Sequence, residues 1–101
     1  MGVETSPNNK EQNMNYAMRP LTTEKVTSSG SSAQSSAFND NIEYIRVIPD
    51  ADCHIEFGVN PTATTSKIFL EAKTSECFKV SGGEKVAVIG SVNLYVTELS
   101  E

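Results

Sequence analysis

An alternation of side chains between residues 42 and 58 constrains the fold of this chain more than any other stretch. In IEYIRVIPDADCHIEFG, five apolar residues fall on every second position of two short segments: Ile45, Val47, Cys53, Ile55 and Phe57. A period of two is typical of a β-strand with one buried and one wet face. The Pro-Asp-Ala-Asp segment at 49–52 favours a turn, because proline fixes φ and aspartate bonds to nearby backbone. The stretch therefore predicts two strands joined by a turn.

The rest of the chain to residue 101 repeats this design. Four further runs combine apolar alternation with flanking turn residues: KIFLEA at 67–72, ECFKV at 76–80, EKVAVI at 84–89 and NLYVTEL at 93–99. Ser81-Gly82-Gly83 predicts a hairpin turn, since glycine accepts positive φ. We expect an all-β fold, a small antiparallel β-sandwich or barrel of about six or seven strands. The seventh strand would come from TTEKVT at 22–27.

Residues 1–41 differ in composition from the segment that follows. They are rich in Ser, Thr and Asn, and TSSGSSAQSS at 27–36 has seven Ser or Thr in ten residues. Such a segment buries too little apolar area to offset the entropy of ordering. We therefore expect an extended, flexible N-terminal arm at 1–41 and a β domain at 42–101. Five apolar residues of the arm are candidate contacts with a partner: Met14, Tyr16, Met18, Leu21 and Val26.

The strand-bearing part is small, which bears on its stability. A domain of about 60 residues buries only about 60% of its chain surface and is marginal alone. Six apolar residues fall on the outward phase of the expected strands: Tyr44, Ile48, Phe69, Ile89, Tyr95 and Leu99. We expect the arm, a second sheet or a neighbouring subunit to cover some of them.

The residues that carry chemistry do not form a catalytic or cofactor motif. His54 is the only histidine, and its neighbour Cys53 points to the opposite face of the same strand, so the two cannot pair. Asp50 and Asp52 lack the further ligands of a calcium loop and are turn residues. Cys53 and Cys77, with one histidine, do not match a zinc pattern. We expect no enzyme activity, no metal and no cofactor.

The net charge and the N-terminal sequence limit the classes of partner and the compartment that we expect for this chain. The chain has 101 residues, with 8 basic and 13 acidic ones, for a net charge of −5. An acidic chain without Lys/Arg clusters favours neither nucleic acid nor an anionic membrane. The first residues, MGVETSPNNKEQ, lack the apolar core of a signal peptide, so we expect both cysteines to remain thiols in a reducing compartment.

Several segments together resemble small virion proteins of tailed bacteriophages, of the type that decorates or cements the capsid. The similarity covers about residues 33–99 and is carried by SSAF at 35–38, CHIEFG at 53–58, NPTATT at 60–65, GGEK at 82–85 and LYVT at 94–97.

The resemblance implies a structural protein on the outer capsid surface, made in the host cytoplasm. Its partners would be the major capsid protein and further copies of itself, as a trimer or dimer. It would stabilise contacts between capsid subunits, with the arm along the shell or a neighbouring copy. Two alternatives stay open: a neck, tail or head-fibre component, and a host-surface or carbohydrate-binding β-sandwich module.

Overall fold

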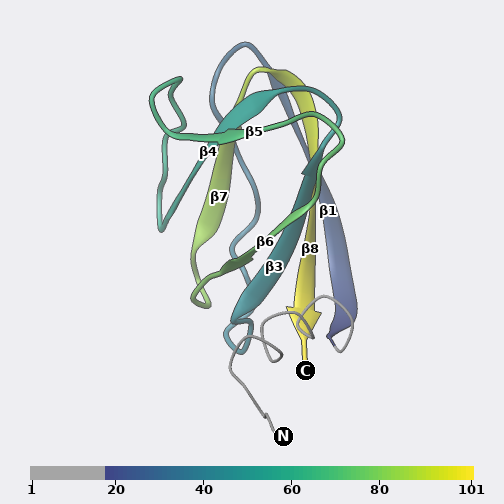
Figure 1. Ribbon diagram of the computed structural model, residues 1–101. Coiled ribbons are helices and arrows are strands. Elements are labelled where there is room, and N and C mark those ends of the chain that lie inside the picture. The colour runs from purple at the N-terminus through teal and green to yellow at the C-terminus, as the bar shows by residue number, and fades with distance from the viewer. Residues whose placement is uncertain (1–17) are drawn as a thin grey trace, which may run out of the picture.

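The computed structural model describes residues 18–101, which form two four-stranded antiparallel sheets packed face to face (Figure 1). The expected all-β class is confirmed, and the architecture is a sandwich. Its eight strands are β1 (Arg19–Ser29), β2 (Ala33–Gln34), β3 (Tyr44–Pro49), β4 (Cys53–Gly58), β5 (Ile68–Leu70), β6 (Glu76–Lys79), β7 (Lys85–Ile89) and β8 (Ser91–Ser100).

The strand order interleaves the two ends of the described chain. The first sheet has the order β1-β8-β3-β6 and the second has the order β2-β7-β4-β5. Only β4 and β5 are neighbours both in sequence and in a sheet. The C-terminal strands β7 and β8 therefore occupy interior positions, while β1 and β2 form the edges on one side.

Two turns that the sequence predicts are present, but each of them connects a strand of one sheet to a strand of the other. The turn at 49–52 leads from β3 in the first sheet to β4 in the second. The predicted hairpin at 81–83 is wrong, because β6 pairs with β3 and β7 pairs with β4. The turn itself is closed by the Glu84 N–H, which donates to the Ser81 carbonyl at 3.1 Å. Gly82 is required there, since a Cβ would lie 2.5 Å from the carbonyl oxygen of Asp40.

The core lies between the sheets and uses the expected inward phase. Its fully buried large side chains come from both sheets: Ile45, Val47, Pro49, Ile55, Leu70, Val86, Val88 and Leu94. Burying a side chain of this size stabilises a fold by about 1.5–3 kcal/mol. The alternation in 42–58 thus positions two strands on opposite sides of one core.

The predicted boundary at residue 41 is wrong. β1 pairs with β8 from Arg19 to Ser29, and Val26 is only 4% exposed in the core. Phe38 and Ile42 are equally buried. The strand expected from TTEKVT lies within β1, so residues 19–41 belong to the sandwich. The rest of the predicted arm, at 1–17, lies outside the described residues.

The serine-rich segment is ordered through its hydroxyls and backbone. Ser28 is buried, donates to the Ser31 carbonyl at 2.7 Å and accepts from the Gly90 N–H at 3.2 Å. Ser35 is buried and accepts from the Val86 N–H at 3.0 Å. These contacts satisfy buried backbone groups, which is why a segment of low hydrophobicity folds here.

Candidate partner-binding surface

The outer face of the first sheet has an open, regular surface. Alternation along its four strands turns a second set of side chains away from the core. This set consists of Thr23, Lys25 and Thr27 on β1, Asn93, Tyr95, Thr97 and Leu99 on β8, Tyr44, Arg46 and Ile48 on β3, and Cys77 and Lys79 on β6. We call it the bare face, because no other described segment is hydrogen-bonded across it.

The centre of the bare face is aromatic and apolar. Tyr95 stands opposite Lys25 on one neighbouring strand and opposite Ile48 on the other. Its side chain is 38% exposed, and Ile48 and Tyr44 are half-buried. Directly opposed residues on adjacent strands are about 5 Å apart, so Lys25 and Ile48 are the nearest cross-strand neighbours of Tyr95, one on each side.

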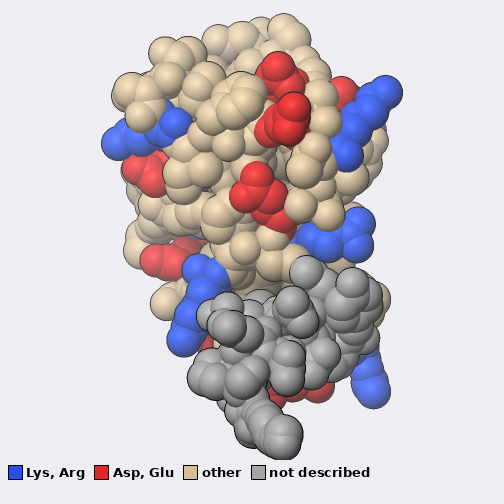
Figure 2. Space-filling view, viewed as in Figure 1, with Lys and Arg blue, Asp and Glu red and all other residues tan. Residues whose placement is uncertain are grey.

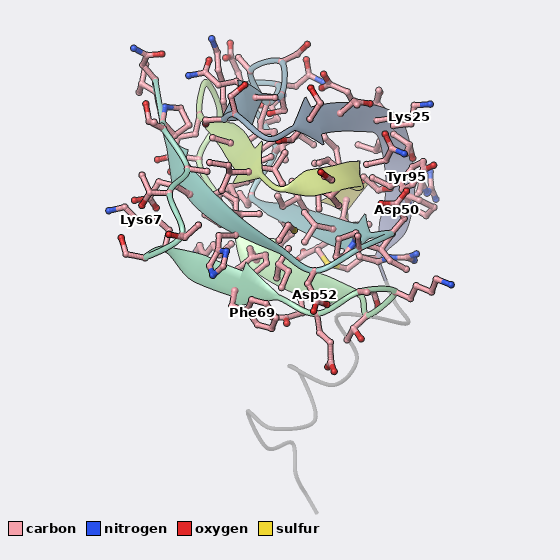
Figure 3. The ribbon with its side chains drawn as sticks, turned by 90° about the horizontal axis from the view of Figure 1, so that it is seen from above. Lys25, Asp50, Asp52, Lys67, Phe69 and Tyr95 are labelled. Atoms are coloured by element: carbon pink, nitrogen blue, oxygen red, sulfur yellow. The ribbon has the colours of Figure 1, made fainter. Side chains whose placement is uncertain are left out.

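Cations surround this centre, and the carboxylates lie at its ends. Lys25, Arg46 and Lys79 are exposed, whereas none of the twelve outward positions is Asp or Glu. From above, Lys25, Tyr95 and Asp50 lie together on one side of the sandwich, and Lys67 and Phe69 lie on the other (Figure 3). Figure 2 shows acidic side chains near the middle of the view and Lys and Arg mainly along its sides.

Asp50 marks one end of the bare face. Its carboxylate accepts from the Asn93 backbone N–H at 2.8 Å and from the Asn93 side-chain amide at 2.9 Å. These two hydrogen bonds lower the pKa of Asp50 below its usual value. Asn93 in turn accepts from the Thr27 hydroxyl at 2.8 Å, so side chains of the sheet itself hold this end.

The outer face of the second sheet is covered by the β4–β5 loop, residues 59–67. Pro61 and Ala63 are buried in this loop. The Gln34 amide donates to the Asn60 side-chain oxygen and to the Pro61 carbonyl, both at 2.8 Å. The Ala63 N–H donates to the Ser32 hydroxyl at 2.9 Å. The loop is thus attached to the chain at β2, across the sheet from β4 where it starts.

Ala87 shows that the cover is close-fitting. It occupies an outward position of β7, between Gln34 on β2 and Glu56 on β4. Even so, its exposed fraction is 0%. Loop 59–67 accounts for this burial, since Gln34, the neighbour of Ala87 on β2, holds Asn60 and Pro61 of the loop.

An apolar pocket remains beside the loop. It has a volume of about 240 Å³ and is lined by Gly30, Asp52, Cys53, His54, Thr65, Phe69, Ile89 and Gly90. Phe69 is 54% exposed, and its ring centroid lies 5.4 Å from that of His54 at an interplanar angle of 60°. The prediction that His54 faces outward while Cys53 is buried is confirmed.

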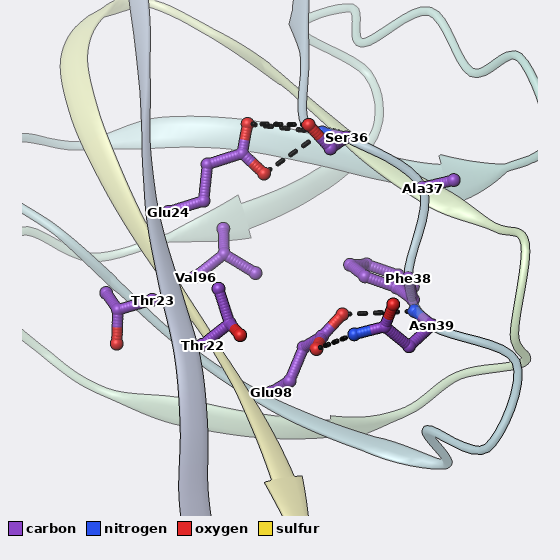
Figure 4. A pocket seen from close by; sticks show the side chains of 9 residues that line it. All are labelled: Thr22, Thr23, Glu24, Ser36, Ala37, Phe38, Asn39, Val96 and Glu98. Carbon is purple, nitrogen blue, oxygen red and sulfur yellow. Dashed lines mark hydrogen bonds between the residues drawn. The ribbon is translucent and has the colours of Figure 1, made fainter.

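A larger cleft of about 550 Å³ opens at the edge where β1 and the β2–β3 connection face each other. Thr22, Thr23, Glu24, Ser36, Ala37, Phe38, Asn39, Val96 and Glu98 line it (Figure 4). Glu98 is 8% exposed and accepts from the Asn39 N–H at 3.1 Å and from its amide at 2.8 Å. Glu24 accepts from the Ser36 N–H at 3.0 and 3.2 Å. All four carboxylate oxygens have donors, so the pair fastens the connection to the first sheet.

The remaining chemically active side chains are widely separated or already engaged. Burial, and then the charges of Asp52 and Asp50, raises the pKa of the Cys53 thiol to about 11. Burial also raises the pKa of Cys77 on the opposite sheet, with nearby Arg46 opposing it. The Asp52 carboxylate accepts from the Ala72 N–H at 2.8 Å and so joins the turn at 49–52 to the segment after β5. Within residues 18–101, no three His, Cys, Asp or Glu side chains gather as metal ligands would.

The predicted partner-contact residues of the arm have different positions. Val26 is in the core, which makes its assignment as a contact wrong, because its side chain points between the sheets. Leu21 is 47% exposed on β1, and Met18 is half-buried just before it. Met14 and Tyr16 lie outside the described residues.

Some of the apolar residues expected on the outward faces are exposed there. The cations of the bare face were not predicted from the sequence. Tyr95 and Phe69 are exposed, whereas Leu99 is only 7% exposed despite its outward phase. The sequence does not show that Lys25 and Arg46 belong to one group. The strand order brings them together, because it places β1 and β3 on the two sides of β8. Their outward phase in each strand was the available signal.

Comparisons with protein-family models, curated proteins and solved structures find no match to this chain. Among the described residues there is also no helix with the length and hydropathy to cross a membrane.

Proposed function

We propose that this chain is a structural virion protein that binds the outside of a tailed-phage head and stabilises contacts between major capsid protein subunits. The observation that carries the proposal is the bare face, a complete four-stranded sheet surface with an exposed aromatic centre and nothing described on it. A module that works by binding needs such a surface and no catalytic cluster. The resemblance of residues 33–99 to capsid decoration proteins supplies the biological setting.

The proposed mechanism is addition of interface without chemistry. A stable interface buries about 1,600 Å² in total, and icosahedral repetition multiplies its contribution over the shell. Exposed Tyr95 and Leu21 are side chains of the kind that lose water on docking. Self-association into a trimer or dimer would bring several such surfaces to one capsid symmetry axis, which raises the avidity of each copy.

Counting copies in purified particles tests the proposal. Quantitative mass spectrometry of virions from the source should give this chain in a simple ratio to the major capsid protein, such as one to one or one to three. About a dozen copies or fewer would place it in the neck, tail or a head fibre instead. Its absence from particles would contradict a virion role altogether.

One observation favours a second candidate, a carbohydrate-binding module. Phe69 is exposed beside the His54 ring in an apolar pocket, and aromatic faces of this kind can stack on sugar rings. A glycan array probed with the wild type and with Phe69→Ser separates this candidate from the first. Binding that Phe69→Ser abolishes and Tyr95→Ser leaves intact would support it.

A further inference from the structure

We propose that the bare face is the docking surface of this protein and that it receives an acidic patch of a protein partner. The inference deepens the proposed function and rests on it only for the identity of that partner as the capsid shell. The assignment of the face and of the partner's charge comes from the sandwich itself.

The two sheets differ in how their outer faces are covered. Loop 59–67 crosses the second sheet and leaves Ala87 with no exposed surface. On the first sheet, the corresponding central strand β8 presents Tyr95 with 38% of its surface exposed. The chain thus covers the interior strand β7 with its own loop and leaves Phe69 exposed only at the edge strand β5, whereas on the first sheet the interior strand β8 itself presents an exposed aromatic side chain.

The bare face carries cations and no carboxylates on its outward positions. The protein has 13 acidic residues and 8 basic ones, yet Lys25, Arg46 and Lys79 meet no carboxylate on any outward position of the four strands. None of the three forms an ion pair with another residue in the part of the chain that the structure describes. Carboxylates lie at its ends, with Asp50 at one and Glu43 and Glu101 beside Tyr44 at the other. A partner patch rich in Asp and Glu complements this middle zone.

The side chains of the bare face favour a protein partner over a nucleic acid. Tyr and Arg are the residue types most enriched among those that dominate protein–protein binding energy, and both lie near the centre of this face. Three cations in a chain of net charge −5 form too small a footprint for nucleic acid, whose binding depends on neutralising many phosphates. An acidic protein surface fits the face better than a nucleic acid does.

The size of the face sets the expected strength. Four strands spaced about 4.8 Å apart, over about five residues each, present roughly 300 Å². A standard interface uses about 800 Å² of each partner. Binding through the bare face by one copy should therefore be weak and sensitive to salt, and many copies on a repeating shell would bind with higher avidity.

The first experiment needs no virus particle. The ¹⁵N-labelled full chain is titrated with an oligo-glutamate peptide and followed by NMR, with oligo-lysine and a DNA oligonucleotide as comparison ligands. We expect saturable shifts from oligo-glutamate at 23–27, 44–48, 77–79 and 93–97, lost when NaCl rises from about 0.05 M to about 0.5 M. Shifts elsewhere, no shifts, or a larger response to the DNA would overturn the assignment.

The second experiment measures binding to purified heads that lack this protein, by co-sedimentation. Lys25→Glu/Lys79→Glu should weaken binding by about tenfold or more, because both reversals face the acidic partner. The matched control Lys67→Glu/Lys85→Glu changes the net charge equally, but Lys67 precedes β5 and Lys85 begins β7, both in the second sheet, and it should bind within about twofold of wild type. Tyr95→Ser should also weaken binding, and Phe69→Ser should not. Thermal unfolding of each variant verifies folding.

The outcomes separate the two proposals. If wild type does not bind heads, the proposed function fails, and the oligo-glutamate titration still decides the bare face. If wild type binds heads and the Lys67/Lys85 control loses binding instead, the face is wrong and the function stands. Deleting residues 2–17 provides a last check, since large shifts confined to the bare face would show that the chain's own N-terminal segment occupies it and would overturn the proposal.

Discussion

The two outer faces of this sandwich have the same strand architecture but differ in whether a loop covers them. Each belongs to a four-stranded sheet whose strands alternate between core and outside. On the second sheet, Gln34 and Ser32 bind loop 59–67 and the outward Ala87 is fully buried. On the first sheet, Thr23 bonds to Thr97 at 3.0 Å and Thr27 to Asn93, so polar groups satisfy one another within the face. One loop and its hydrogen bonds therefore decide whether an outer sheet face of this sandwich is covered or exposed.

The largest difference between the two faces is expected when a charge is placed at an outward position of each interior strand. Ala87→Lys puts an ammonium beneath loop 59–67 and should lower the free energy of unfolding by about 3 kcal/mol, since the charge loses water without gaining a partner. Thr97→Lys, on the half-buried outward phase of β8, should cost less than about 1 kcal/mol. Urea denaturation measures both. Equal losses would mean that the two faces are equally covered in solution.

A smaller effect is expected from detaching the loop while keeping the sheet. Ser32→Ala removes the acceptor of the buried Ala63 N–H and should cost about 1–2 kcal/mol. Hydrogen exchange should accelerate mainly in residues 59–67, because the loop loses its attachment to Ser32 while the strands of the sheet stay paired. Thr64→Ala is the control, since the Thr64 hydroxyl that it removes bonds to Ser66 within the loop. Unchanged exchange in Ser32→Ala would show that this contact does not hold the cover.

The smallest effect is the pH dependence of the Asp50 end of the bare face. Its folded-state pKa is lowered by the Asn93 hydrogen bonds, so the ionised form stabilises the fold. That contribution is complete above the unfolded value of about 3.9 and is lost as the pH falls through the lower folded value. An NMR titration should place the Asp50 midpoint below 3.9, and Asn93→Ala should move it upward. A midpoint at the ordinary value would contradict the hydrogen bonds at this end.

The sequence was informative about strands and their phases because both depend on local alternation. The six runs after residue 42 all contain strands, and the inward residues, such as Ile55 and Leu94, are buried as predicted. Pairing could not be predicted, since β1 meets β8 and β2 meets β7 across most of the chain. Ser35 shows why the boundary at 41 failed: a serine is classed as polar by composition, whereas here it is buried with its hydroxyl bonded to β7.

The candidate surface was predictable only in parts. The outward apolar residues, including Tyr95, followed from phase alone. The group of Lys25, Arg46 and Lys79 required the order β1-β8-β3-β6, which no local pattern encodes. The cover on the second sheet was also not foreseeable, because a polar loop with one proline gives no sign of the face on which it folds.

The position of β7 and β8 has a consequence for how the protein is made. Both are interior strands, and they are formed by residues 85–100. Until the ribosome has released these residues, β1 and β2 have no strand to pair with, and only the pairs β3–β6 and β4–β5 can form. A nascent chain that has not reached residue 85 therefore carries unpaired, partly apolar strands, and a premature stop before that residue would leave such strands exposed to aggregation.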